Sequence, residues 1–138
     1  MSFQIIHLLL DFGLMVLIWI IQRIVYPSFI HYGTENLVGW HKEYIRKLNP
    51  IVIPLMFGQL GIYIYQVVIS VTAYTIISLG IVLVIWISTF FQFVPIHSNI
   101  SKGKVSEKML RSLVKKNWIR TLLWTTLFLY SMVNHSIA

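Results

Sequence analysis

Four long apolar runs set the main constraint on the fold of this 138-residue chain. They lie at about residues 3–24, 49–70, 72–95 and 109–135. Each is close to the roughly 20 residues that a helix needs to cross a bilayer. The runs are continuous rather than alternating in hydropathy, which favours helices over a transmembrane β-barrel. We therefore predict an all-α integral membrane protein, folded as a single four-helix bundle with no separate extramembrane domain.

The composition agrees with this prediction. Hydrophobic residues make up 57% of the chain and charged residues only 11%, against about 25% charged in a typical soluble domain. So few charges cannot cover a soluble globule, which excludes a soluble enzyme, and the high hydrophobicity excludes a disordered chain. The chain has no cysteine, so disulfides, thiolate metal sites and cysteine nucleophiles are excluded as well.

The basic residues predict the orientation of the bundle. All eleven lie in or beside the two loops that follow the first and third runs: Arg23, Lys42, Arg46 and Lys47, then Lys102, Lys104, Lys108, Arg111, Lys115, Lys116 and Arg120. By the positive-inside rule, both loops are expected in the cytoplasm and both termini outside, in the cell's inner (plasma) membrane. Membrane lipids are the expected partners. Nucleic acid is not, because no basic fold with interleaved aromatic residues is present.

A short amphipathic helix is expected before the second run, at about residues 35–48, with Thr34 as its N-cap. Pro50 and Pro54 then permit either a kink or a new helix start. The fourth helix should begin early, near Glu107, and project below the membrane.

Asp11 lies near the middle of the first run, where a lone carboxylate is costly. His7 is one helical turn away, and Gln59 and Thr125 lie near the middle of other runs. Two interpretations remain open. Asp11 contacts substrate or relays protons, or it is a protonated carboxyl hydrogen-bonded to Gln59 or Thr125 that fastens the bundle.

Several polar side chains are expected at the cytoplasmic ends of the helices, among them His31, His41, Tyr44, Gln92, His97, Asn117 and Arg120. They indicate a pocket at the inner leaflet, although anchoring at the interface is the alternative. With Glu43, the three histidines His31, His41 and His97 could ligate a transition metal. Separate interfacial histidines and no cofactor are the alternative, since the spacing matches no metal motif.

Two segments carry a family resemblance: Thr89-Phe-Phe-Gln-Phe-Val-Pro-Ile-His97, and Asn117-Trp-Ile-Arg-Thr-Leu-Leu-Trp124. They resemble the anthrone oxygenase-like family of small four-helix membrane proteins, much of which has no known function. The resemblance implies oxidation of a lipophilic aromatic substrate by O₂ without an obvious cofactor. Thr89, Pro95, Asn117, Arg120 and Thr121 fit the motif, whereas His97 stands where the family more often has Asn.

The resulting hypothesis is a membrane oxidoreductase, or oxygenase, acting on a lipophilic small molecule. Arg120 and Asn117 would hold the polar end of the substrate, and His41, His97 and Tyr44 would carry the proton chemistry. The remaining expected substrate contacts are Asp11, Gln59, Thr89, Gln92 and Trp124. A non-enzymatic protein that binds a lipid or small molecule, or a partner subunit, is the alternative, and a homo-oligomer also remains open.

Overall fold

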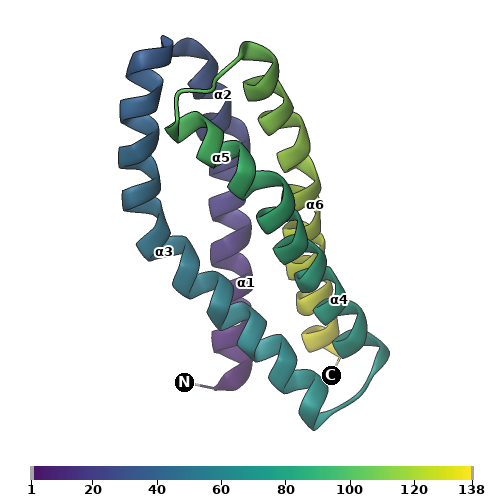
Figure 1. Cartoon of the computed structure of the whole chain (residues 1–138). Coiled ribbons are helices and arrows are strands. Elements are labelled where there is room, and N and C mark those ends of the chain that lie inside the picture. The colour runs from purple at the N-terminus through teal and green to yellow at the C-terminus, as the bar shows by residue number, and fades with distance from the viewer. Residues whose placement is uncertain (1, 138) are drawn as a thin grey trace.

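The computed structural model describes residues 2–137, and in this range the chain is helical without a strand. It forms four long helical segments (Figure 1). The first comprises α1 (Phe3–Ile20), the π-helical turn η1 (Ile21–Val25), α2 (Tyr26–Ser28) and the 3₁₀ turn η2 (Phe29–His31). The second is α3 (Thr34–Ile69). The third comprises α4 (Ala73–Ser88), the π-helical turn η3 (Thr89–Phe93) and α5 (Val94–Ser101), and the fourth is α6 (Glu107–Ile137).

The four segments run up and down along a common direction (Figure 1). Both chain ends lie at one end of the bundle, together with the short link between α3 and α4. The links from η2 to α3 and from α5 to α6 lie at the other end. This is the predicted four-helix order, and the four predicted runs match the four observed segments except at Ser70 and Thr72, which lie in the α3–α4 link.

Local sequence explains where the helices begin and end. The Ser2 hydroxyl accepts a hydrogen bond from the Ile5 N–H, and Thr72 and Thr75 form a capping box at the start of α4. After α5, the Lys104 N–H bonds to the Asn99 carbonyl and the Gly103 N–H to the Ile100 carbonyl. This Schellman arrangement places Gly103 at φ 77°, a conformation that glycine adopts readily.

Proline residues shape the end of the bundle away from the chain termini. Pro27 and Pro95 each follow a π-helical turn by two residues and occupy the first turn of α2 and α5. A proline lacks the N–H and clashes with the carbonyl four residues earlier, so a wider turn before it relieves the clash. In α3, Pro50 and Pro54 lie inside one helix of 36 residues, which bends part-way along its length in Figure 1. The predicted amphipathic helix is therefore the first part of α3 rather than a separate element.

Three segments are long and apolar enough to cross a membrane: Phe3–His31, Thr34–Ile69 and Ala73–Ser101. This is consistent with a membrane protein. The predicted fourth span is helical and long enough, but α6 is not among the segments that are sufficiently apolar. Polar residues on its inner face contribute to this, since Asn117, Arg120, Thr121 and Ser131 are buried.

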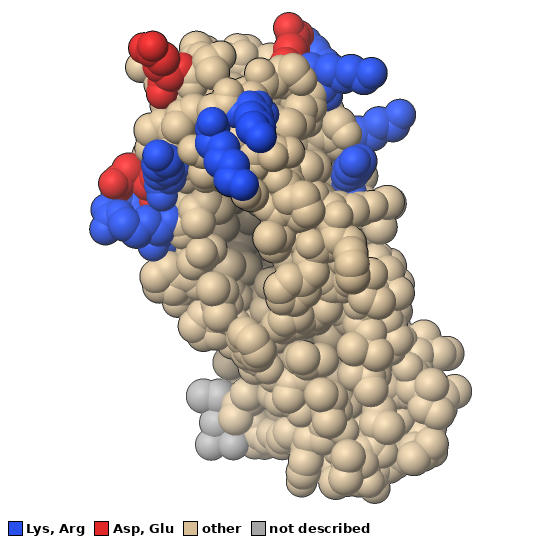
Figure 2. Space-filling view, in the orientation of Figure 1, with Lys and Arg blue, Asp and Glu red and all other residues tan. Residues whose placement is uncertain are grey.

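The polarity of the surface and of the interior is the reverse of that in a water-soluble protein. Large apolar side chains such as Phe57, Val68 and Phe91 are exposed along the helices, whereas polar side chains including Asp11, Gln59 and Asn117 are buried. Charged side chains gather at the end that holds the α5–α6 link, and the opposite half of the face in Figure 2 shows none. We call these the basic end and the neutral end.

Candidate functional site

A cavity of about 390 Å³ lies near the basic end, between α3 on one side and η3 with α5 on the other. Fifteen residues line it: Ile21, Tyr26, Tyr44, Ile45, Leu48, Asn49, Val52, Met56, Thr89, Phe93, Val94, His97, Ser98, Ser101 and Arg120. Most of this lining is apolar, and a few polar groups converge on it. A volume in this range and such a lining are typical of small-molecule sites.

Among the described residues that line the cavity, Arg120 is the only one with a cationic side chain. Its guanidinium lies 4.1 Å from the centre of the Phe93 ring and 5.4 Å from that of Trp124. The side chain is 6% exposed, its Nε has no hydrogen-bond partner, and among residues 2–137 no carboxylate pairs with it. Contacts with aromatic faces compensate only part of the cost of burying a guanidinium. Arg120 therefore keeps unused capacity to bind an anionic oxygen.

His41 and His97 form a directly bonded pair beside Arg120. The His41 Nε2 and His97 Nδ1 atoms are 2.7 Å apart, and the two rings stack with centres 4.9 Å apart. The outer nitrogens are also engaged: His97 Nε2 lies 2.9 Å from Tyr26 Oη, and His41 Nδ1 lies 3.1 Å from Ser101 Oγ.

A neutral imidazole has one donor and one acceptor nitrogen, so hydrogen bonds run in a single direction along Tyr26, His97, His41 and Ser101. A proton taken up at His97 can consequently be passed to His41 and towards the end of α5.

Tyr44 closes the cavity on the side of α3. It is buried and lines the cavity, and its hydroxyl has no hydrogen-bond partner. A buried hydroxyl without a partner costs about 1–3 kcal/mol. A bound polar group would recover that free energy. Phe29 holds the ring of Tyr44 and that of His41 by edge-to-face contacts.

Other predicted residues lie outside the cavity. Asn117 donates a hydrogen bond to Gln22 Oε1 at 2.9 Å, and Thr121 donates to the same oxygen at 3.1 Å. Gln22 in turn donates to the Val114 carbonyl, so this group ties α6 to η1. Gln92 accepts a hydrogen bond from Ser88. Thr89 does line the cavity, although its hydroxyl donates to the Ile85 carbonyl.

The predicted metal ligands do not all meet. His41 and His97 are adjacent, but His31 is exposed on η2. In residues 2–137, no three His, Asp or Glu side chains converge in a way that could hold a metal ion. Glu43 lies on the exposed face of α3, where it pairs with Arg46.

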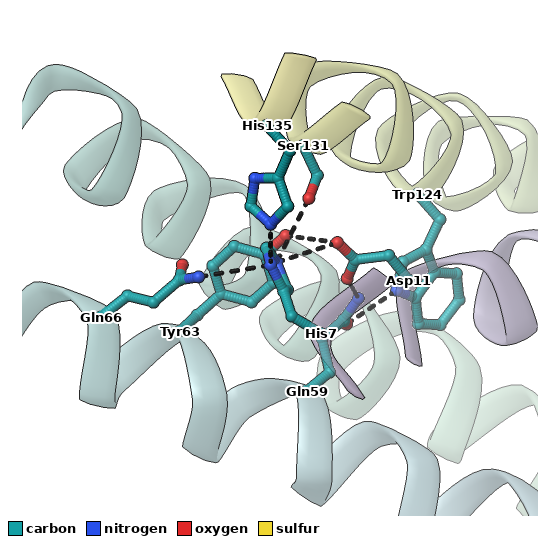
Figure 3. Close-up of polar contacts among 8 residues, drawn as sticks. All are labelled: His7, Asp11, Gln59, Tyr63, Gln66, Trp124, Ser131 and His135. Atoms are coloured by element: carbon teal, nitrogen blue, oxygen red, sulfur yellow. Dashed lines mark hydrogen bonds and ion pairs between the residues drawn. The ribbon is translucent and has the colours of Figure 1, made fainter. Parts of the chain in front are cut away.

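Asp11 and Gln59 belong to a second polar cluster, nearer the neutral end (Figure 3). Gln59 Nε2 donates to Asp11 Oδ1 at 2.8 Å, which is one of the two hydrogen bonds considered for Asp11 from the sequence. The other candidate, Thr125, instead accepts a hydrogen bond from the Trp19 indole. Trp124 donates to Gln59 Oε1 and thereby connects this cluster to Arg120.

Sequence reasoning missed several contributors to the site at the basic end, among them Ser101 and Met56. Ser101 lies one turn after His97 on the same face of α5, and this spacing was the available signal. Met56 also lines the cavity, and its position depends on the bend of α3, which no local pattern fixes.

Comparisons of this chain with protein-family models, with curated proteins and with solved structures found no match.

Proposed function

We propose that this is a four-span integral protein of the inner (plasma) membrane that binds a lipophilic small molecule with an acidic oxygen. Three apolar segments support insertion in a bilayer. The fourth, α6, would cross with them, because its polar residues face the interior and exposed Leu122, Leu129 and Val133 face outwards. The basic end would lie in the cytoplasm and the neutral end outside.

The buried guanidinium of Arg120, which has no carboxylate partner among residues 2–137, carries this proposal. A ligand oxygen that is anionic, or becomes so, would supply the missing partner, and Tyr44 Oη can donate a second hydrogen bond. The apolar wall formed by Ile45, Val52 and Phe93 suits a hydrocarbon or aromatic body. Membrane location concentrates such molecules beside the cavity.

The histidine pair supports an enzymatic role. Both ring nitrogens of His97 are engaged, so a proton leaving the ligand would reach His97 through the Tyr26 hydroxyl, which lines the cavity. His41 lies behind His97 to accept that proton. Arg120 would hold the resulting enolate or phenolate oxygen. In the reaction suggested by the family resemblance, O₂ oxidises a ring CH₂ to C=O. One oxygen atom enters the product and the other leaves as water.

The test uses anthrone as the probe with protein reconstituted in lipid nanodiscs. We expect the wild type to accelerate formation of anthraquinone with matching O₂ uptake. The rate should fall at least tenfold in His97→Gln and Arg120→Gln. Arg111→Gln is the matched control, because Arg111 lies on the same helix but is exposed. Equal rates in Arg120→Gln and Arg111→Gln would contradict the proposal.

Non-enzymatic binding of a membrane lipid is the second candidate, and it is favoured by the same Arg120. Native mass spectrometry of protein released from nanodiscs would detect a retained anionic lipid. If anthrone is not oxidised and Arg120→Gln alone loses the lipid, the cavity is a lipid-binding site rather than a catalytic one.

A further inference from the structure

Seven side chains from three helices meet near the neutral end (Figure 3). His7 and Asp11 come from α1, Gln59, Tyr63 and Gln66 from α3, and Ser131 and His135 from α6. His7 and Asp11 are both fully buried. The proposed function at the basic end makes no use of them.

Asp11 accepts a hydrogen bond at each of its two carboxyl oxygens. An indole N–H only donates, so Trp124 fixes the Gln59 amide with Oε1 towards the indole and Nε2 towards Asp11 Oδ1. Tyr63 Oη donates to Asp11 Oδ2 at 2.6 Å. Both carboxylate oxygens thus receive a donor.

Within residues 2–137, His7 is the one basic side chain in direct contact with Asp11. Its Nε2 atom lies 3.1 Å from Asp11 Oδ2. No Lys or Arg of the chain lies before residue 23 or after residue 120, so none can reach this end. The other titratable groups facing the pair are Tyr63 of α3, Tyr74 of α4 and His135 of α6. A proton on His7 would therefore compensate the charge of an ionised Asp11.

His7 also has a route to the surface. Its Nδ1 atom lies 3.4 Å from His135 Nε2, and His135 lines a second cavity of about 280 Å³ at the neutral end. That cavity is lined by polar side chains including Gln66, Thr72 and Asn134. An imidazole can take a proton at one nitrogen and release one at the other, so His7 can connect His135 to Asp11.

We propose that His7 and Asp11 form a proton-binding site that exchanges protons with the solution at the neutral end through His135. The site stands independently of the cavity at the basic end. Its ligand is the proton itself.

Asp11 is the chain's only aspartate, which permits a selective test. Protein labelled with ¹³Cγ-aspartate gives one carboxyl resonance by solid-state NMR in lipid bilayers. On acidification we expect this resonance to move from the carboxylate to the carboxylic-acid position. In His7→Gln the change should occur at least one pH unit higher, because the carboxylate has lost its cationic partner. His7→Asn serves if the longer amide disturbs folding.

Glu43→Gln, which removes an exposed carboxylate on the basic end, is the matched control and should leave the titration unchanged. A resonance that stays in one form between pH 4 and pH 9, or a midpoint that the His7 variants do not move, would overturn the proposal.

Access through His135 is tested at the midpoint of the titration. The wild type should give one averaged resonance, because exchange is fast. His135→Phe should give two separate resonances, because it removes the intermediate carrier. Two resonances in the wild type, or a single one in His135→Phe, would overturn the route.

Discussion

Trp124 lies where the two polar clusters meet. Its ring is buried, with the Arg120 guanidinium on one side, and its N–H is bonded to Gln59 at 3.0 Å. One residue therefore forms part of the surroundings of the cavity and also orients the amide that bonds to Asp11.

We expect Trp124→Phe to destabilise the bundle by about 1–3 kcal/mol, because Gln59 Oε1 loses its donor in a buried site. Trp86→Phe is the matched control. The Trp86 Nε1–H is buried without a hydrogen-bond partner, so its removal should cost less. Unfolding in mixed detergent, followed by circular dichroism, measures both changes. A larger loss in Trp86→Phe would contradict the assignment of these hydrogen bonds.

Some side-chain contacts were predictable from the position of the residues along their helices alone. Asp11 and Gln59 lie near the middle of two helices, and a carboxyl in an apolar setting needs a polar neighbour at its own depth. Asn117 shows the limit of this reasoning. It lies at the same end as Arg120 and one turn away, yet it bonds to Gln22 rather than facing the cavity. The rotation of α6 against α1 decides between these outcomes, and that rotation depends on packing across the whole bundle.

Two of the four helical segments have the same irregularity in their backbone near the basic end. In each, a π-helical turn is followed by a proline two residues later: η1 with Pro27, and η3 with Pro95. Tyr26 follows the first turn directly, and His97 lies in the first helical turn after Pro95. The side chains of these two residues are hydrogen-bonded at 2.9 Å. The irregular turns thus set the positions of two site residues relative to each other.

The end of α5 gives a prediction about backbone conformation. Gly103→Ala should destabilise the fold by about 1–2 kcal/mol, because an L-residue is strained at φ 77°. Space does not limit this change, since an added Cβ would lie 4.0 Å from Val38. Gly61→Ala, inside α3 with nothing within 4 Å, should instead stabilise by about 0.5–1 kcal/mol. Thermal unfolding in detergent measures both changes in stability. If Gly103→Ala and Gly61→Ala shift the unfolding temperature in the same direction, this explanation is contradicted.

Helix existence was predictable because continuous apolar runs of this length allow few alternatives. The continuity of α3 was not, since Pro50 and Pro54 permit both a kink and a break. The extension of the third segment to Ser101 was also missed. Pro95 normally favours a helix end, but the wider turn η3 accommodates it.

At the scale of the whole molecule, the proposed orientation is open to a direct test. The chain has no cysteine, so a single introduced thiol gives an unambiguous signal. We expect a membrane-impermeant maleimide to label exposed Val71→Cys in intact cells. Lys104→Cys should be labelled only after the cells are permeabilised. The reverse pattern would place the basic end outside.

The bond from Trp124 to Gln59 has a consequence for the membrane that surrounds the bundle. Ionisable groups occur towards both ends of the interior, and side-chain contacts connect one cluster to the other. An indole nitrogen donates a hydrogen bond but cannot accept one, so protons cannot be transferred from one cluster to the other through this ring. In the proposed orientation, the bundle would hold acid–base chemistry in both leaflets without a proton path through this contact that discharges the electrochemical gradient.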